Sequence, residues 1–291
     1  MERLLARLDP RTALRIRRSV ARARLKQRKL TAGRRMLPGL VVLGAQRCGT
    51  SSLYRYLGEH PNLAASLRKE TEYFTRAFHN GERWYRAHFP LVTKARRDRL
   101  LAFEATPDYL FHPLAPARIA ASLPDARFIV LLRDPTERAI SHFQHMTRLG
   151  FESLEPEAAL LSEQDRIGDA RAALLNEDPR VVRDALRFSY VSRGLYAQQL
   201  GGWLEAFERE RFLILNSRDL FHDTEQTLRQ VTDFLGLPPC VTSPRRNYSY
   251  ARGAAPDRMA VPRSVQEALK EIYLQPNREL YDLLGSSFGW S

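Results

Sequence analysis

The sequence predicts an α/β fold in which helices flank a central parallel sheet. Short, continuous apolar runs recur along the chain, as is typical of buried parallel strands. Each run is followed by a segment with helical periodicity and helix start or stop signals, and this alternation favours a parallel sheet. With 291 residues, of which 44% are hydrophobic, the chain can bury one sizeable core. We therefore expect a single domain, preceded by a basic N-terminal helical arm.

The arm is defined by its charge. Residues 1–35 contain thirteen Lys and Arg against Glu2 and Asp9, so this stretch carries +11 of the formal net charge of +13. We divide the chain into a basic arm, residues 1–36, and a folded domain, residues 37–291. The arm is expected to be a solvated helix or to contact an anionic membrane surface or another polyanion, and no sequence-specific nucleic-acid partner is predicted.

Two classes of protein are disfavoured by composition. A secretory signal or a membrane span needs a longer apolar run than residues 40–43 provide, so a cytoplasmic protein is expected, either free or peripheral at a membrane. Cys48 and Cys240 cannot form a disulfide framework, and neither lies in a cluster with zinc-ligand spacing. No metal site is predicted.

The first strand is expected at residues 40–43, Leu-Val-Val-Leu, and it ends at Gly44. The glycine-containing loop that follows leads directly into a helix. Thr50 or Ser51 is the expected N-cap of this helix, and Gly58 is part of its stop signal. The chain thus predicts a strand, a glycine loop and a helix in direct succession.

A second buried strand is predicted at residues 127–132, Arg-Phe-Ile-Val-Leu-Leu. It is followed by Asp134 as N-cap, Pro135 at the first helical position and Glu137 at the third, which is a strong helix start. Later segments add a helix at 195–207, a strand at 212–215 and a helix at 223–235. Residues 152–187 lack strand signals and are predicted to form a helical insertion or flap.

The loop Gly44-Ala-Gln-Arg47-Cys48-Gly49-Thr50 lies between the first strand and helix. Backbone N–H groups at such a helix N-terminus bind anions, so a phosphate or sulfate is expected there. The spacing GxxxxG matches that of the P-loop, so a P-loop-like central sheet is expected. However, Thr50 stands where a nucleoside triphosphatase has Lys, and Arg47 is the nearest cation, which disfavours an ordinary ATPase or kinase.

Two motifs together carry a family resemblance: GAQRCGTSSL at 44–53 and LRDPTERAISHF at 132–143. They resemble the sulfotransferases that use 3′-phosphoadenylyl sulfate (PAPS), most closely the heparan-sulfate-type N- and 3-O-sulfotransferases and related bacterial enzymes. The similarity extends over EATPDYL at 104–110, RGLYAQQLGGWLEAF at 193–207 and residues 220–237. It implies PAPS as co-substrate, adenosine 3′,5′-bisphosphate (PAP) as product, and no metal.

The resemblance also implies the nucleotide-binding residues. Arg133 and Ser141 would hold the 3′-phosphate, and Arg252 with Gly253 would stand in for the family's Lys-Gly-aromatic turn, although Ala254 replaces the aromatic residue. Arg133 follows a strand beside a helix N-terminus, so its guanidinium and the helix dipole could act on one phosphate. The alternative for Arg133 is an ion pair with Asp134 or Glu137. The 5′-phosphosulfate would be bound by Arg47, Cys48, Gly49, Thr50 and Ser51.

In-line sulfuryl transfer requires a base for the acceptor and a cation for the departing oxygen. Arg47 is predicted to stabilise charge, because a guanidinium does not give up its proton at neutral pH. Glu70, in a segment that resembles the family's Lys-Glu-x-x-x-Phe motif, is implied to be the base, although by composition alone it would be a solvated surface charge. His145 is implied as a secondary base. The predicted acceptor contacts are Lys69, Asp108, Tyr109 and Trp84.

The acceptor is expected to be a hydroxyl or amine of a glycan, a lipid or a small molecule. Two rival functions remain open at this point. One is a P-loop-type nucleotide kinase, which the missing Lys after Gly49 disfavours. The other is a non-catalytic protein that binds a polyanion or a membrane through its basic arm. A cysteine phosphatase is excluded, because Arg55 lies one residue beyond the C-x5-R spacing from Cys48.

Overall fold

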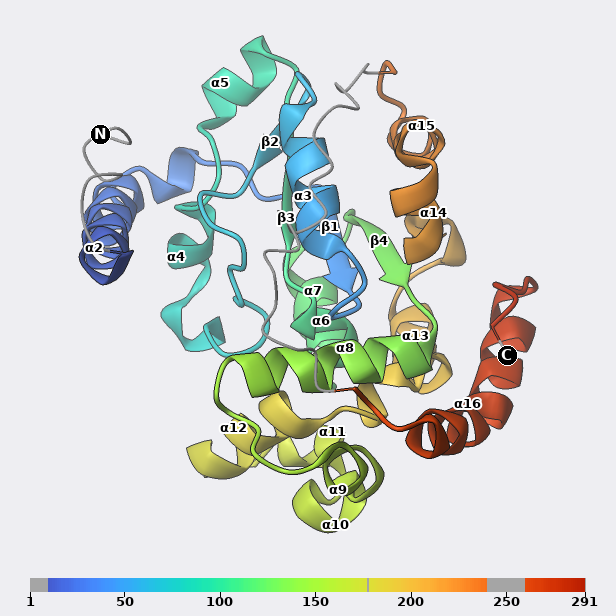
Figure 1. The fold of residues 1–291 in the computed structure, drawn as a ribbon. Helices are drawn as coiled ribbons and strands as arrows, with labels where there is room; N and C mark the ends of the chain where they lie inside the picture. Colours follow the sequence, from blue (N-terminus) through green and yellow to red (C-terminus); the bar gives the residue numbers. More distant parts are fainter. Residues whose placement is uncertain (1–9, 177, 240–259, 291) are drawn as a thin grey trace.

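The computed structural model describes residues 10–176, 178–239 and 260–290 (Figure 1). Its centre is a five-stranded sheet in the order β2-β3-β1-β4-β5, and every neighbouring pair is parallel. The predicted parallel sheet is therefore confirmed. The strands are β1 (Leu40–Gly44), β2 (Leu63–Ala65), β3 (Leu101–Ala105), β4 (Arg127–Leu132) and β5 (Phe212–Asn216).

The middle strand β1 is entirely buried, and β4 is buried from Phe128 onward. Both are covered on their two faces by helices, which explains why they read as continuous apolar runs. Strand β1 pairs with β3 on one side and β4 on the other, so that Leu40 lies opposite Phe103 and Arg127. On β4, the ring of Phe128 packs against Trp203, with ring centres 5.6 Å apart.

Helices lie on both faces of the sheet and extend below it in the view of Figure 1. The helices next to the strands that carry the motifs are α3 (Thr50–Glu59), which follows β1, and α8 (Pro135–Arg148), which follows β4. The remaining α-helices are α2 (Pro10–Lys29), α4 (Glu82–Arg86), α5 (Val92–Arg97), α6 (Asp108–Phe111), α7 (Ala115–Ser122), α9 (Pro156–Leu161), α10 (Glu163–Ile167), α11 (Ala170–Ala173), α12 (Pro179–Phe188), α13 (Tyr196–Ala206), α14 (Ser217–His222), α15 (Thr224–Leu235) and α16 (Arg263–Leu284). Short 3₁₀ turns are η1 (Ala32–Arg34), η2 (Phe78–Asn80), η3 (Ser192–Gly194) and η4 (Arg209–Arg211).

The two helix starts that were predicted from sequence differ in outcome. At α8 the prediction is confirmed: Asp134 is the N-cap, and its Oδ1 accepts a hydrogen bond from the N–H of Glu137 at 2.9 Å. At α3 the prediction of a Thr50 or Ser51 cap is wrong. Gly49 is the N-cap, in a left-handed conformation with φ of 96°, and no side chain caps the helix. The left-handed conformation favours glycine, and it leaves the first N–H groups of α3 free to bind something else.

Residues 152–187 form the helices α9 to α12, which lie below α8 in Figure 1. The prediction of a helical insertion is thereby confirmed.

The end of the N-terminal arm is tied to the body by arginine side chains that bind carbonyl oxygens. Arg28 Nε donates to the carbonyl of Ala87 at 2.7 Å, and Arg35 Nη1 donates to that of Phe89 at 2.9 Å. Over the ranges that the structure covers, no helix has the length and apolar character needed to cross a membrane.

Candidate functional site

The candidate site lies at the carboxyl ends of β1, β3 and β4. The chain leaves β1 toward β2 on one side of the sheet, whereas the chain that leaves β4 continues to β5 on the other. Ligands of open α/β sheets bind in the crevice at such a reversal of strand order. The glycine loop follows β1, Asp108 lies just beyond β3, and Arg133 follows β4. The topology therefore brings the sequence-predicted residues to one edge of the sheet.

The loop between β1 and α3 is joined to α8 by a side-chain hydrogen bond. Arg47, whose φ is 70°, donates from Nε to Ser141 Oγ at 3.2 Å. Because a hydroxyl has one proton and two lone pairs, Ser141 can accept this bond and still donate to a ligand. Residues 94 positions apart in the sequence are thus brought together, and both were predicted to bind the donor nucleotide.

Cys48 has a different position in the same loop. Its side chain is fully buried, and Sγ lies 3.8 Å from the hydroxyl of Tyr196. Burial raises the pKa of the Cys48 thiol, so the group stays protonated at neutral pH. The backbone N–H of Cys48 donates to the carbonyl of Ala45 at 3.2 Å, so in this structure Cys48 supports the shape of the loop.

Positive charge is concentrated around Arg47. Burial lowers the pKa of its guanidinium, and the neighbouring cations Arg148, Arg133 and Arg138 lower it further. Arg138 is completely buried, and its Nε and Nη1 atoms have no hydrogen-bond partner in the described structure. Cations held this close, next to the free N-terminus of α3, produce a strong attraction for an anion.

Arg133 forms the ion pair that the sequence left open as an alternative. Its Nε and Nη2 atoms donate to Glu137 Oε2 at 2.9 and 2.7 Å. The two side chains are 34% and 62% exposed, and an exposed pair of this kind contributes only about 0–1 kcal/mol. A bound phosphate can therefore compete with Glu137 for Arg133. The main chain at this position is fixed by the Tyr196 hydroxyl, which donates to the carbonyl of Arg133 at 3.0 Å.

Glu70 lies on the opposite side of the site, in the loop after β2. Lys69 Nζ is 3.2 Å from Glu70 Oε1. Burial raises the pKa of the Glu70 carboxyl, Lys69 lowers it, and Asp108 raises it. Asp108 is itself held by a buried ion pair, in which Arg193 Nη1 lies 2.9 Å from its Oδ1. Glu70, Lys69 and Asp108 form one electrostatic group, as expected if all three face the acceptor.

Glu104 is a central residue that the sequence analysis did not single out. It has no exposed surface, and its carboxylate accepts hydrogen bonds from four hydroxyl groups. Thr71 and Thr106 donate to Oε2 at 2.5 and 3.0 Å, and Tyr85 and Tyr109 donate to Oε1 at 2.5 and 3.1 Å. Since Thr71 follows Glu70 directly, Glu104 fixes the loop that carries the predicted base. The available signal was a lone charged residue in the otherwise apolar run 101–105.

The two sides of the site meet around β1 and α6. The N–H of Thr106 donates to the carbonyl of Val42 at 3.1 Å, and Thr106 Oγ1 accepts a bond from the N–H of Glu72 at 3.4 Å. Gly44, at the start of the anion loop, packs so closely on α6 that a Cβ there would lie 2.8 Å from Leu110 Cβ. The anion loop and the Glu70 loop therefore share a common support.

The other predicted residues have less direct positions. Tyr109 is completely buried and supports Glu104, and Trp84 is half-buried with its ring 4.5 Å from that of His88. His145 Nδ1 lies 2.9 Å from Arg148 Nη2. Burial, together with Arg47 and Arg148, lowers the pKa of His145 to about 4, so its ring is neutral at pH 7.

Two predicted nucleotide-binding residues could not be placed. Arg252 and Gly253, which were expected to close over the nucleotide, lie outside the described residues. Within the described ranges, the structure brings together no group of three or more His, Cys, Asp or Glu side chains that could hold a metal ion.

Comparison with known proteins identifies the relatives of this chain. Residues 37–253 match the family described as "Sulfotransferase domain". Human heparan sulfate glucosamine 3-O-sulfotransferase 6 is 31% identical over 277 residues, which cover 89% of this chain and 75% of the relative. The human bifunctional heparan sulfate N-deacetylase/N-sulfotransferase 3 is 31% identical over 223 residues, which cover 74% of this chain and 23% of the relative.

A solved structure agrees with the sequence comparison. The sulfotransferase from Alicyclobacillus acidocaldarius superimposes with a TM-score of 0.64 at 26% identity. The superposition covers 87% of this chain and 98% of that protein. The likeness therefore extends over most of the chain.

Proposed function

This chain belongs to the sulfotransferase domain family, and we propose that it transfers the sulfuryl group of PAPS in line to a hydroxyl or amine of a glycan. The observation that carries the proposal is the cluster of cations at the anion loop. Arg47 hydrogen-bonds to Ser141 and is surrounded by Arg133, Arg138 and Arg148. A donor with a phosphosulfate at one end and a second phosphate nearby would neutralise such a cluster.

The residues present fit both anionic groups of PAPS. The free N–H groups at the start of α3, with the hydroxyls of Thr50 and Ser51, would bind the 5′-phosphosulfate. Arg133 and the Ser141 hydroxyl would bind the 3′-phosphate at the start of α8. Arg133 has only to exchange an exposed carboxylate for a phosphate, and both interactions are charge-assisted hydrogen bonds. Binding through these groups requires no metal.

Transfer needs a base and a stabilising cation. Glu70 would remove the proton of the acceptor hydroxyl or amine as the new bond to sulfur forms. Because burial raises the pKa of Glu70, its carboxylate is a stronger base than a solvated one. Arg47 would stabilise the negative charge that develops on the departing phosphate oxygen of PAP. Lys69 would orient Glu70. Because its pKa is lowered to about 4, His145 is a weak proton acceptor, so beside Arg47 it would serve as a neutral contact to the acceptor.

The acceptor is proposed to be a glycan because the matched curated relatives act on heparan sulfate, as their names state. Asp108 and Lys69 are the proposed polar contacts to it, since Arg193 holds Asp108 beside Glu70. Tyr109 and Trp84 would act through packing, because Tyr109 is buried beneath the loop that carries Glu70.

Measurement of sulfate transfer from PAPS to N-desulfated heparan chains, with EDTA present, tests the proposal. Wild-type protein should transfer without metal, and Glu70→Gln should reduce the rate about 10³-fold, in the range observed for loss of a general base. Glu70→Gln should keep its affinity for PAP. A folded protein that does not bind PAP but phosphorylates an acceptor with Mg²⁺ and ATP would support the kinase alternative instead.

A further inference from the structure

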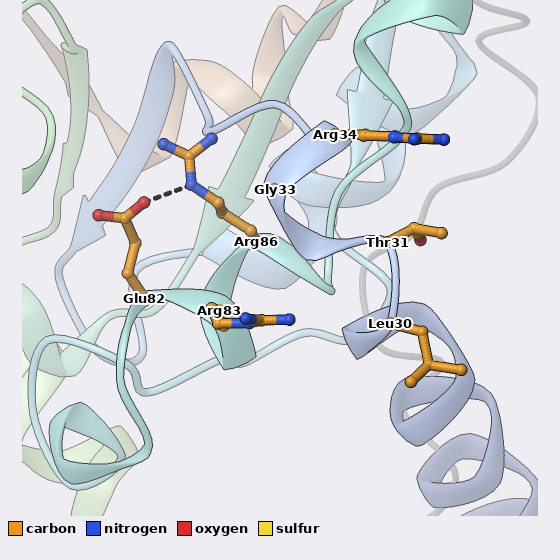
Figure 2. Close-up of a pocket in the computed structure, with 7 residues that line it drawn as sticks. All are labelled: Leu30, Thr31, Gly33, Arg34, Glu82, Arg83 and Arg86. Atoms are coloured by element: carbon orange, nitrogen blue, oxygen red, sulfur yellow. Dashed lines mark hydrogen bonds and ion pairs between the residues drawn. The ribbon is translucent and has the colours of Figure 1, made fainter.

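A basic cavity lies outside the transfer site, between the end of the arm and the body. Its volume is about 520 Å³, and it is lined by Leu30, Arg34, Glu82, Arg83 and Arg86 among others (Figure 2). Arg34 comes from η1, and the other charged residues come from α4. The arm and α4 therefore build the cavity together, and neither forms it alone.

The cavity has more cations than carboxylates. Its acidic side chain, Glu82, already pairs with Arg86, as the dashed line in Figure 2 marks. Arg34 and Arg83 form no ion pair or side-chain hydrogen bond with any described residue. Figure 2 shows both guanidinium groups directed to the same side of the cavity. Two unpaired guanidinium groups of this kind match the bidentate geometry of sulfate and carboxylate groups.

The arm also keeps its charge where it is attached. Arg28 and Arg35 bind the backbone carbonyls of Ala87 and Phe89 and not carboxylates. Carbonyl oxygens satisfy the N–H donors but do not cancel the charge. Burial and the neighbouring Arg35 and Arg24 lower the pKa of Arg28 to about 10. The attachment of the arm next to the cavity therefore adds positive charge at neutral pH.

The cavity adjoins the segment that carries the proposed base. The N–H of Leu67, three residues before Glu70, donates to the carbonyl of His88 at 2.8 Å, just beyond α4. On the inner side of α4, Trp84 packs against Tyr73, with ring centres 6.1 Å apart. Helix α4 therefore contacts the cavity through Glu82, Arg83 and Arg86, and the segment of Glu70 through Trp84.

We propose that this cavity binds acidic groups of the polyanionic polysaccharide whose other residues enter the transfer site, and that the basic arm thereby serves as a subsite for the acceptor. A polysaccharide is favoured over a membrane because the surface is concave and lined by guanidinium groups, with Leu30 as its large apolar side chain. Insertion into a bilayer would use an apolar face, and the flat headgroup surface of an anionic bilayer matches a concave cavity less well than a flexible chain of acidic groups does. The inference rests on the proposed function, but its test measures binding and does not require turnover.

The test compares Arg34→Glu/Arg83→Glu with the matched control Arg218→Glu/Arg278→Glu. The control makes the same change in net charge at exposed arginines on α14 and α16, away from α2 in Figure 1. Binding of a fluorescent heparan sulfate octasaccharide is measured by anisotropy at physiological salt. The cavity variant should lose affinity about tenfold or more, because two charge-assisted contacts become repulsive, whereas the control should change by less than about threefold.

Further measurements separate the possible failures. PAP binding by calorimetry should be the same in the wild type and both variants; if wild-type protein does not bind PAP, the proposed function fails independently of the cavity. Equal loss of octasaccharide binding in both variants would overturn the proposal in favour of a general charge effect. It is also overturned if the cavity variant keeps octasaccharide binding but loses binding to phosphatidylserine vesicles, since the cavity would then be a membrane contact.

Discussion

The donor side and the acceptor side of the candidate site are built in different ways. On the donor side, Arg47, Ser141 and Arg133 come from two strand-loop-helix units, and their charges have few protein partners. On the acceptor side, Glu70 lies on a loop that Glu104 holds through Thr71, and the buried pair of Asp108 and Arg193 is part of the same electrostatic group.

The two sides differ in how their charged groups are balanced when no substrate is bound. The cations of the donor side repel one another and require an anion, so that ligand binding should relieve an unfavourable charge distribution. On the acceptor side, the protein itself satisfies the buried carboxylate of Glu104, since four hydroxyl donors surround it. We infer that the charges of the donor side are neutralised only when a ligand binds, whereas the Glu70 loop of the acceptor side is stabilised by the fold itself.

Apart from Glu70, the largest effect on transfer is expected at Arg47. Arg47→Ala should reduce the rate of sulfate transfer about 10²- to 10³-fold, as is usual when one preorganised electrostatic contact to the developing charge is removed. Arg47→Lys, which keeps a cation, should retain more activity than Arg47→Ala. The comparison is made with PAPS and the acceptor both at saturation. Equal rates for the two variants would show that the charge of Arg47 does not act in the transfer step.

A smaller effect is expected at Glu104. A change there tests whether the acceptor side can be altered without affecting the donor side. Glu104→Gln removes a buried acceptor for hydroxyl protons and should lower the free energy of unfolding by about 1–3 kcal/mol. Because the Glu70 loop loosens, transfer should slow about tenfold, while PAP affinity stays unchanged. Denaturant unfolding, transfer assays and calorimetry measure the three quantities. A large loss of PAP affinity would mean that the two sides are not independent.

The sequence predicted the donor side better than the acceptor side for a physical reason. The first strand and the Asp134 cap of α8 are local patterns, and the anion loop lies between a strand and its helix. Strand β3 was missed because Glu104 interrupts its apolar run. Glu104 is stable in the core only because hydroxyl groups from distant segments meet it in the fold.

Two other features could not be predicted from local sequence patterns. The N-cap of α3 was assigned to Thr50 or Ser51, whereas Gly49 takes the position in a left-handed conformation that a propensity for hydroxyl caps does not reveal. Helix α16 contains Pro276 in its interior, a residue that normally predicts a break.

The smallest effect concerns His88, at the edge of the acceptor side near the arm. Burial, together with Arg68 and Arg28, lowers the pKa of His88 from 6.5 to about 4. Between these values the unfolded chain binds a proton that the folded chain does not, so stability falls as the pH drops from about 6.5 toward 4, by at most about 1.4 kcal/mol per pH unit for this residue. Urea unfolding at pH 7 and pH 5 should show a smaller difference for His88→Leu than for wild type. An identical difference would mean that the residue is not linked to folding in this way.

The cations around Arg47 and Arg133 are proposed to form the nucleotide site, and calorimetric titration with PAP in the absence of metal is the decisive experiment. Wild-type protein should bind PAP, and Arg133→Ala should weaken the affinity about tenfold or more, because the charge-assisted bonds to the 3′-phosphate are lost. No binding of PAP to folded wild-type protein, or an unchanged affinity in Arg133→Ala, would contradict it.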